Sequence, residues 1–194
     1  MRYKILDQNG LNYLTFTMVE WIDLFTRPVY KDIIVESLAF CQREKALRVH
    51  AFVIMSNHVH AILSTESEAG LSSIINSFKS FTAKAFLQYL KGDKNPESRR
   101  EWLLNHFAFN ARKNKTKSQY QIWQSSNHPV LLYSPKVIRQ KVSYIHNNPV
   151  VLGIVEHAED YVYSSASNYA RDGEGVLIVD VLDVLWNDVG WIQT

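Results

Sequence analysis

Two histidines separated by a single residue, His58 and His60, have the type and spacing of a metal-binding pair. They lie in a run of β-forming residues, where successive side chains point to opposite faces, so both imidazoles project from one face and Val59 from the other. Two imidazoles placed in this way can chelate one metal ion. The same pattern also fits a pair of surface histidines, and the spacing alone does not decide between these alternatives.

The metal that such a pair would bind is constrained by the cysteine content. Cys41 is the single cysteine, so neither an intrachain disulfide nor a thiolate zinc site can form. Imidazole together with oxygen ligands suits Mn²⁺, Mg²⁺ or Zn²⁺ with coordination positions left open for a substrate.

A tyrosine near the end of a predicted helix is the second candidate. Tyr144 lies four residues before Asn148, a spacing that places both side chains on one helical face. A phenol there could attack a phosphorus atom while the amide oxygen contributes to a metal site. Pro149 is expected to end the helix, at about Asn147. Tyr144 could equally be a core residue, because the chain has ten tyrosines and the pattern alone does not select one.

The elements that must position these residues follow from hydrophobic periodicity. The pattern predicts strands at 12–19, 49–55 and 58–63, with a two-residue turn of Ser56 and Asn57 between the last two. Helical spacing of apolar residues predicts helices at 29–47 and 71–90.

The second half of the chain is less regular. We expect 91–118 to be a mobile, basic connection that contains a short helix at 101–109. Short strands at 121–123 and 130–133 precede a helix that begins at Pro135. The rest is predicted to be irregular or short-helical, with a last apolar run at 176–186.

This order of elements, β-α-β-β-α-β with a late helix, predicts an α+β fold. The expected architecture is a ferredoxin-like antiparallel sheet sandwiched with helices. We expect a single domain over residues 1–194, with a core at about 12–150 and a C-terminal extension at 151–194.

Charge is distributed unevenly along the chain, although the net charge is only +2. Residues 150–194 carry eight acids and one base, whereas 91–118 carry eight Lys and Arg against three acids. A basic segment of this kind suits a polyanionic partner, although it is also compatible with a solvated face. The candidates for contacts to a phosphate backbone are Lys79, Lys84, Arg112, Lys113, Lys115 and Lys117.

The first residues have no apolar signal core, and no apolar run approaches the roughly 20 residues of a membrane helix. We therefore expect a soluble, cytoplasmic protein without a membrane partner.

Two motifs together resemble the HUH single-tyrosine transposases, and within them the REP-associated tyrosine transposase branch. They are Val53-Ile-Met-Ser-Asn-His-Val-His-Ala-Ile-Leu63 and Tyr144-Ile-His-Asn-Asn-Pro-Val150. Supporting segments are Phe78-Lys-Ser-Phe-Thr-Ala-Lys84, Ile122-Trp-Gln124 and Tyr161-Val-Tyr-Ser-Ser-Ala166. The similarity extends in order over about residues 12–170.

The resemblance implies an HUH endonuclease fold with an extra C-terminal helix that carries the tyrosine. It implies that Tyr144 is the nucleophile that forms a 5′-phosphotyrosine bond and frees a 3′-hydroxyl. His58 and His60 would hold a divalent metal, Mg²⁺ or Mn²⁺, with Asn148 as a further ligand and His146 as a less favoured substitute. The implied partner is single-stranded or hairpin DNA.

Several alternatives stay open at this point. The chain could be a domesticated protein that binds DNA hairpins without cutting them, or a metal-dependent phosphodiesterase that uses water as its nucleophile. Related insertion-sequence enzymes exchange helices in dimers, whereas members of the REP-associated branch act alone, so a homodimer and a monomer are both compatible. The long basic segment 91–118 and the acidic C-terminal tail depart from the compact family pattern, which leaves the DNA specificity undefined.

Overall fold

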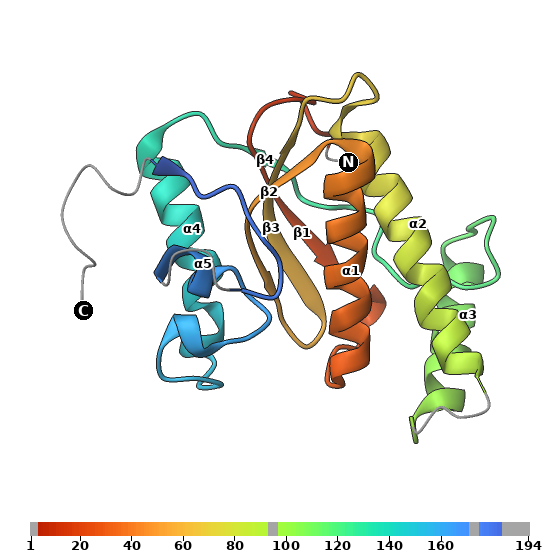
Figure 1. Cartoon of the computed structure of the whole chain (residues 1–194). Coiled ribbons are helices and arrows are strands. Elements are labelled where there is room, and N and C mark those ends of the chain that lie inside the picture. Colours follow the sequence, from red (N-terminus) through yellow and green to blue (C-terminus); the bar gives the residue numbers. More distant parts are fainter. Residues whose placement is uncertain (1–3, 93–96, 171–174, 184–194) are drawn as a thin grey trace.

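A four-stranded antiparallel sheet forms the centre of the computed structural model, which describes residues 4–92, 97–170 and 175–183 (Figure 1). The strand order is β2-β3-β1-β4. The strands are β1 (Asn12–Thr17), β2 (Leu47–Ile54), β3 (His58–Thr65) and β4 (Val130–Leu131). In this order β3 lies between β1 and β2, which follow one another in the chain. This arrangement is that of a split βαβ unit, so the ferredoxin-like sheet predicted from the order of elements is confirmed.

Helices cover both faces of the sheet. Figure 1 shows α1 (Pro28–Lys45) and α2 (Gly70–Lys91) on one face, and α4 (Pro135–Val151) and α5 (Ala166–Ala170) on the other. Alternate residues of β1 point to opposite faces of the sheet and pack against different helices. Leu14 and Phe16 are buried on the α1 and α2 side, where the Phe16 ring meets Phe78 of α2 at 5.5 Å between centroids. Tyr13 and Thr15 point to the α4 side, toward His60.

The connection between β2 and β3 is the predicted two-residue turn. Ser56 and Asn57 form it, and the Met55 amide donates to the His58 carbonyl at 2.8 Å to close it. The turn and the pairing of β3 with both neighbours fix the register in which Thr17 faces His58 and Thr15 faces His60. A one-residue slip would move both histidines to the other face, so this register determines their position.

A 14-residue helix, α3 (Arg100–Lys113), replaces half of the mobile connection predicted at 91–118. The helix predicted at 101–109 is therefore shorter than the observed helix. Leu103, Phe107 and Ala111 recur at intervals of four residues and are buried, which gives the segment an apolar stripe that packs alongside α2. The basic residues of α3 lie on its remaining, solvated surface. Because of them the segment was predicted to be a loop, although its apolar residues have helical periodicity.

The short strands predicted after α3 are reduced in the structure. Residues 121–123 contribute only an isolated bridge between Trp123 and Met18. The strand expected at 130–133 is limited to the two residues of β4.

The tyrosine-bearing helix continues past the proline that was expected to end it. Pro149 lies inside α4, which runs to Val151. Proline removes the hydrogen bond to the carbonyl of Ile145, one turn earlier, but this loss falls within the last turn, and both residues are buried. The helix ends at Val151, and Gly153 follows the C-cap residue Leu152 with a φ of 67°, the left-handed conformation common just beyond a helix.

The remaining described segments are short. The 3₁₀ turns η1 (Val19–Trp21) and η2 (Ala158–Asp160) flank β1 and α5. Residues 175–182 form neither helix nor strand, and residues 184–186 of the predicted apolar run 176–186 lie outside the described residues. Within the described part of the chain, no helix has the length and apolar composition needed to cross a bilayer.

Candidate active site

The two histidines of β3 lie side by side on the sheet face that α4 covers. Their ring centroids are 4.6 Å apart with the rings inclined by 69°. Burial lowers the pKa of both imidazoles. Burial together with the nearby His58 and Lys141 lowers the pKa of His60 to about 3. Both rings are therefore neutral at physiological pH, which is the form that binds metal ions.

Hydrogen bonds around Asn57 define the tautomer of His58. The Asn57 amide nitrogen donates to the Trp21 carbonyl at 3.2 Å and to Asp23 Oδ1 at 2.9 Å. The amide oxygen must then face His58, whose Nδ1 lies 2.7 Å away and donates to it. This arrangement leaves Nε2 of His58 with a lone pair for a metal, because a hydrogen bond from the other ring nitrogen fixes the tautomer and the orientation of the imidazole.

Two hydroxyls of β1 orient His60 in a similar way. The Nδ1 atom lies 2.8 Å from the Tyr13 hydroxyl and 2.9 Å from Thr15 Oγ1. Because these contacts use Nδ1, the Nε2 atom of His60 is also left for a metal. Burial raises the pKa of Tyr13 to about 12, so its hydroxyl stays protonated.

Tyr144 extends from α4 toward His60. Its ring centroid lies 5.3 Å from that of His60 and 6.4 Å from that of Tyr13, and its side chain is 50% exposed. A surface hollow of about 260 Å³ beside it is lined by Tyr144 and Asn148 among other residues of α4. The structure thus brings His58, His60 and Tyr144 together, with Asn148 one helical turn beyond the tyrosine.

His146 is not part of this group. It is buried, its Nε2 lies 2.9 Å from Ser165 Oγ, and its ring packs on Tyr169 of α5. Burial lowers its pKa to about 4. Its place on another face of α4 agrees with the expectation that it is the less favoured ligand.

The sequence analysis missed three residues of the site: Tyr13, Thr15 and Lys141. The Lys141 ammonium lies 4.5 Å from the Tyr13 ring centroid and 5.6 Å from that of Tyr144. Its position three residues before Tyr144 on a helix was a usable signal. Tyr13 and Thr15 could be found only once the pairing of β1 with β3 was known.

The donor set fits a divalent metal with open coordination positions. The described residues contain no cluster of three His, Cys, Asp or Glu side chains that could hold an ion. His58 and His60 would therefore be joined by oxygen donors such as the Asn148 amide or a substrate phosphate. Two imidazoles with oxygen ligands suit Mn²⁺ or Mg²⁺ bound together with a substrate.

The predicted phosphate contacts differ in position. Lys79 donates to the Gln124 carbonyl at 2.6 Å and to Asn127 Oδ1 at 2.7 Å, and burial lowers its pKa to about 8. It therefore anchors the 124–127 loop, and its contact with a DNA strand stays a prediction. Lys113 forms an ion pair with Glu20, with 3.8 Å between Nζ and Oε1. The other four predicted contacts are exposed: Lys84 on α2, and Arg112, Lys115 and Lys117 at and beyond the end of α3.

Comparisons with known proteins concern the family and the fold of the chain. The family model described as "Transposase IS200 like" matches residues 15–121, which include both histidines and end before Tyr144. A REP-associated tyrosine transposase bound to a REP hairpin has a similar fold, with a TM-score of 0.63 and 19% identity over 100% of this chain and 99% of that one.

A putative transposase from Deinococcus radiodurans R1 is 16% identical, with a TM-score of 0.40 over 76% of this chain and 97% of that chain. No curated protein matches the sequence. The match to the family model extends over more than half of the chain. The chain therefore belongs to the IS200-like transposase family.

Proposed function

We propose that this chain cleaves and rejoins single-stranded DNA at hairpin-forming repeats, with Tyr144 as the nucleophile. The observation that carries the proposal is the position of the Tyr144 ring, which is half exposed and lies 5.3 Å from the ring of His60. A tyrosine of the core would be buried, whereas Tyr144 is half exposed and still contacts the ring of His60.

The proposed reaction exchanges one phosphoester for another. The Tyr144 oxygen forms a bond to phosphorus, the bond from phosphorus to the 3′-oxygen breaks, and the phenolic proton ends on the leaving group. The products are a 5′-phosphotyrosine and a free 3′-hydroxyl. The same hydroxyl, or that of another strand, can attack the phosphotyrosine and restore a phosphodiester. Because the number of phosphoester bonds is conserved, the exchange requires no nucleotide cofactor.

The residues around Tyr144 have distinct parts in this scheme. His58 and His60 would hold a divalent metal that, when bound, acts as a Lewis acid on the scissile phosphate. The Lys141 ammonium, 5.6 Å from the centroid of the Tyr144 ring, places positive charge beside the phenol that would become the nucleophile. Asn148 extends the same face of α4 and is the candidate for a third protein ligand.

The nature of the DNA is supported by the fold comparison. The REP-associated transposase with a similar fold is bound to a REP hairpin. We carry this substrate class over to the present chain, where it agrees with the excess of basic residues in 1–149 and in 91–118.

A covalent-adduct assay tests the proposal. Hairpin oligonucleotides with single-stranded flanks and a 3′-end label are incubated with the full chain and Mn²⁺, then separated under denaturing conditions. Wild type should retain the label on the protein, and EDTA or Tyr144→Phe should abolish this signal. Tyr133→Phe is a matched control, because Tyr133 is 83% exposed and lies just before α4, outside the described site.

Two results would contradict the proposal. Tight binding of hairpins without any adduct would indicate a DNA-binding protein that performs no chemistry. Cleavage that survives Tyr144→Phe would indicate a metal-dependent phosphodiesterase that uses water as its nucleophile.

A further inference from the structure

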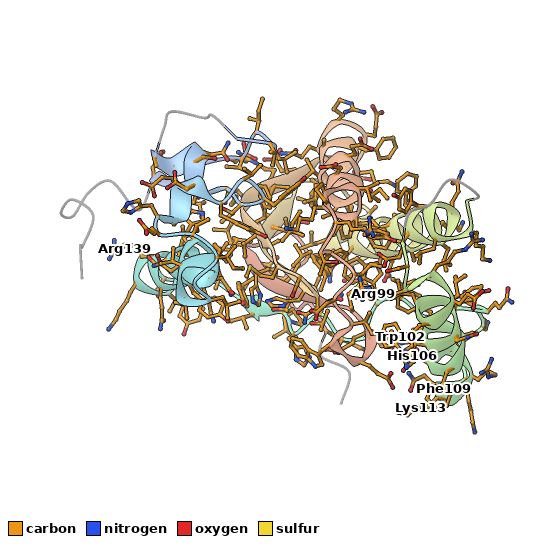
Figure 2. All side chains as sticks on the ribbon, turned by 90° about the horizontal axis from the view of Figure 1, so that it is seen from below. Arg99, Trp102, His106, Phe109, Lys113 and Arg139 are labelled. Atoms are coloured by element: carbon orange, nitrogen blue, oxygen red, sulfur yellow. The ribbon has the colours of Figure 1, made fainter. Side chains whose placement is uncertain are left out.

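One exposed face of α3 carries a row of aromatic and basic side chains. Arg99, Trp102, His106, Phe109 and Lys113 alternate at spacings of three and four residues, which places them on one side of the helix. Figure 2 shows the five side chains in this order along α3, with Arg139 of α4 on the other side of the molecule. We refer to these five residues as the α3 face.

The aromatic members of the α3 face are not core residues. Trp102 is 47% exposed and Phe109 is 50% exposed, whereas Leu103 and Phe107 on the opposite side of α3 are buried. The helix therefore buries its own apolar stripe and still presents large rings to solvent. The Trp102 and His106 rings lie 4.1 Å apart, and the His106 ring is held by a 3.0 Å hydrogen bond between Nδ1 and the Trp102 carbonyl.

Basic side chains flank these rings, and the two on the α3 face itself are paired with acids: Arg99 with Glu97 at 3.1 Å and Lys113 with Glu20 at 3.8 Å. Residues 99–118 contain six Lys and Arg and one acid, Glu101. The Lys113 ammonium lies 5.9 Å from the centroid of the Phe109 ring, and Arg112, Lys115 and Lys117 are exposed next to it. Aromatic rings set among cations are the arrangement that proteins use to stack unpaired bases while neutralising the phosphates that join them.

The α3 face is connected to the active site through residues 20–23. Lys113 lies 3.8 Å from Glu20, and Arg99 donates to the Asp23 carbonyl at 3.1 Å. Between these two contacts, the Trp21 ring lies 5.8 Å from that of His58. Residues 20–23 thus contact the α3 face on one side and His58 on the other.

The connecting segment has a strained backbone. Glu20 and Trp21 adopt φ angles of 52° and 55°, in the left-handed region that bulky residues rarely occupy. Such conformations are retained where the surrounding structure holds them and cluster at functional sites. The Asn57 bond to the Trp21 carbonyl provides this restraint, so the segment is held in place next to His58.

We propose that the α3 face binds the single-stranded DNA that adjoins the cleavage site, with bases stacked on Trp102 and Phe109. The proposal deepens the proposed function and rests on it, because it assigns a place to the unpaired flank of the same substrate. A single strand fits better than a duplex, since duplex bases have no free faces to offer to a ring. It fits better than a protein partner, because the exposed charged side chains at and beyond the end of α3, Arg112, Lys115 and Lys117, are all cationic.

Binding to two probes of equal length tests the proposal. Fluorescence anisotropy is measured with labelled dT12 and with the dT12·dA12 duplex, in the full chain carrying Tyr144→Phe so that no chemistry interferes. Trp102→Ala and Phe109→Ala should each weaken dT12 binding about tenfold, the effect of losing one stacked base, and change duplex binding less than about twofold. Phe40→Ala is the matched control, since Phe40 is 48% exposed on α1 and should leave both affinities unchanged.

Several results would overturn the proposal. It fails if both variants bind dT12 as the parent does, or if each loses dT12 and duplex affinity in equal proportion. A change in sedimentation without a change in DNA affinity would instead identify a protein interface. Trp102→Phe, which keeps a ring, should retain most of the dT12 affinity and shows that any loss in Trp102→Ala is not a folding defect. Absence of a Tyr144 adduct in wild type would contradict the proposed function and leave this binding comparison intact.

Discussion

Replacing Asn57 by alanine tests whether the metal-binding pair depends on the turn that precedes it. The change removes the acceptor for His58 Nδ1 and both bonds that the amide donates, to the Trp21 carbonyl and to Asp23. The His58 ring then loses the contact that fixes its tautomer. Loss of such an outer contact typically costs about 10- to 100-fold in metal affinity, which corresponds to about 1.4 to 2.7 kcal/mol.

Titration calorimetry with Mn²⁺ measures this loss directly. Ser56→Ala is the control from the same turn, because the Ser56 hydroxyl donates only to Asp23 and contacts neither histidine. Asn57→Asp separates the effect of the accepted bond from that of the donated bonds, because it keeps the acceptor for His58 Nδ1 and loses both bonds that the amide donates. We expect Asn57→Ala to bind Mn²⁺ weakly, and Asn57→Asp and Ser56→Ala to bind it well. Equal Mn²⁺ affinity in Asn57→Ala and wild type would refute the reasoning.

Three further predictions concern neighbouring groups. Lys141→Met should slow formation of the Tyr144 adduct about tenfold or more in single-turnover assays, with Lys141→Arg close to wild type, because a nearby cation stabilises the phenolate. Lys79→Met should lower the free energy of unfolding in urea by about 1–3 kcal/mol and leave dT12 affinity unchanged, since its ammonium satisfies two loop acceptors. Burial lowers the pKa of His50, so protons bind the unfolded chain first as the pH falls. Stability should decrease from pH 7 to pH 5, with a smaller slope in His50→Gln.

The fold was predictable where hydrophobic periodicity is undisturbed. Runs of β-forming residues predicted strands at 12–19 and 58–63, which the structure places at 12–17 and 58–65. The alternation of side chains along a strand places His58 and His60 on one face. The apolar stripe of α2 likewise predicted its bounds to within a residue at each end. In these segments local preference and tertiary packing favour the same structure.

The predictions failed where a local signal competed with packing. Pro149 normally ends a helix, but the buried stripe of α4 continues through it, so the helix persists. The basic residues of 91–118 suggested a loop, yet Leu103, Phe107 and Ala111 supply enough buried surface to order α3. The bonds of Lys79 to the 124–127 loop could not be foreseen either, because no local pattern connects this loop to α2, and the contact of Lys79 with DNA stays a prediction.

The arrangement of Tyr144 has a consequence for how the site is assembled. Its helix is fixed by neighbours that are buried, Val142 and Ile145, while the phenol itself lies at the edge of the packed face. The Tyr144 ring therefore reaches the His60 of its own chain through the packing of α4 against the sheet, without a flexible connection. Because α4 continues to Val151, Asn148 is held on the same rigid helix. We infer that Tyr144 and Asn148 of one chain are both positioned next to its histidine-bearing sheet by the same packing of α4.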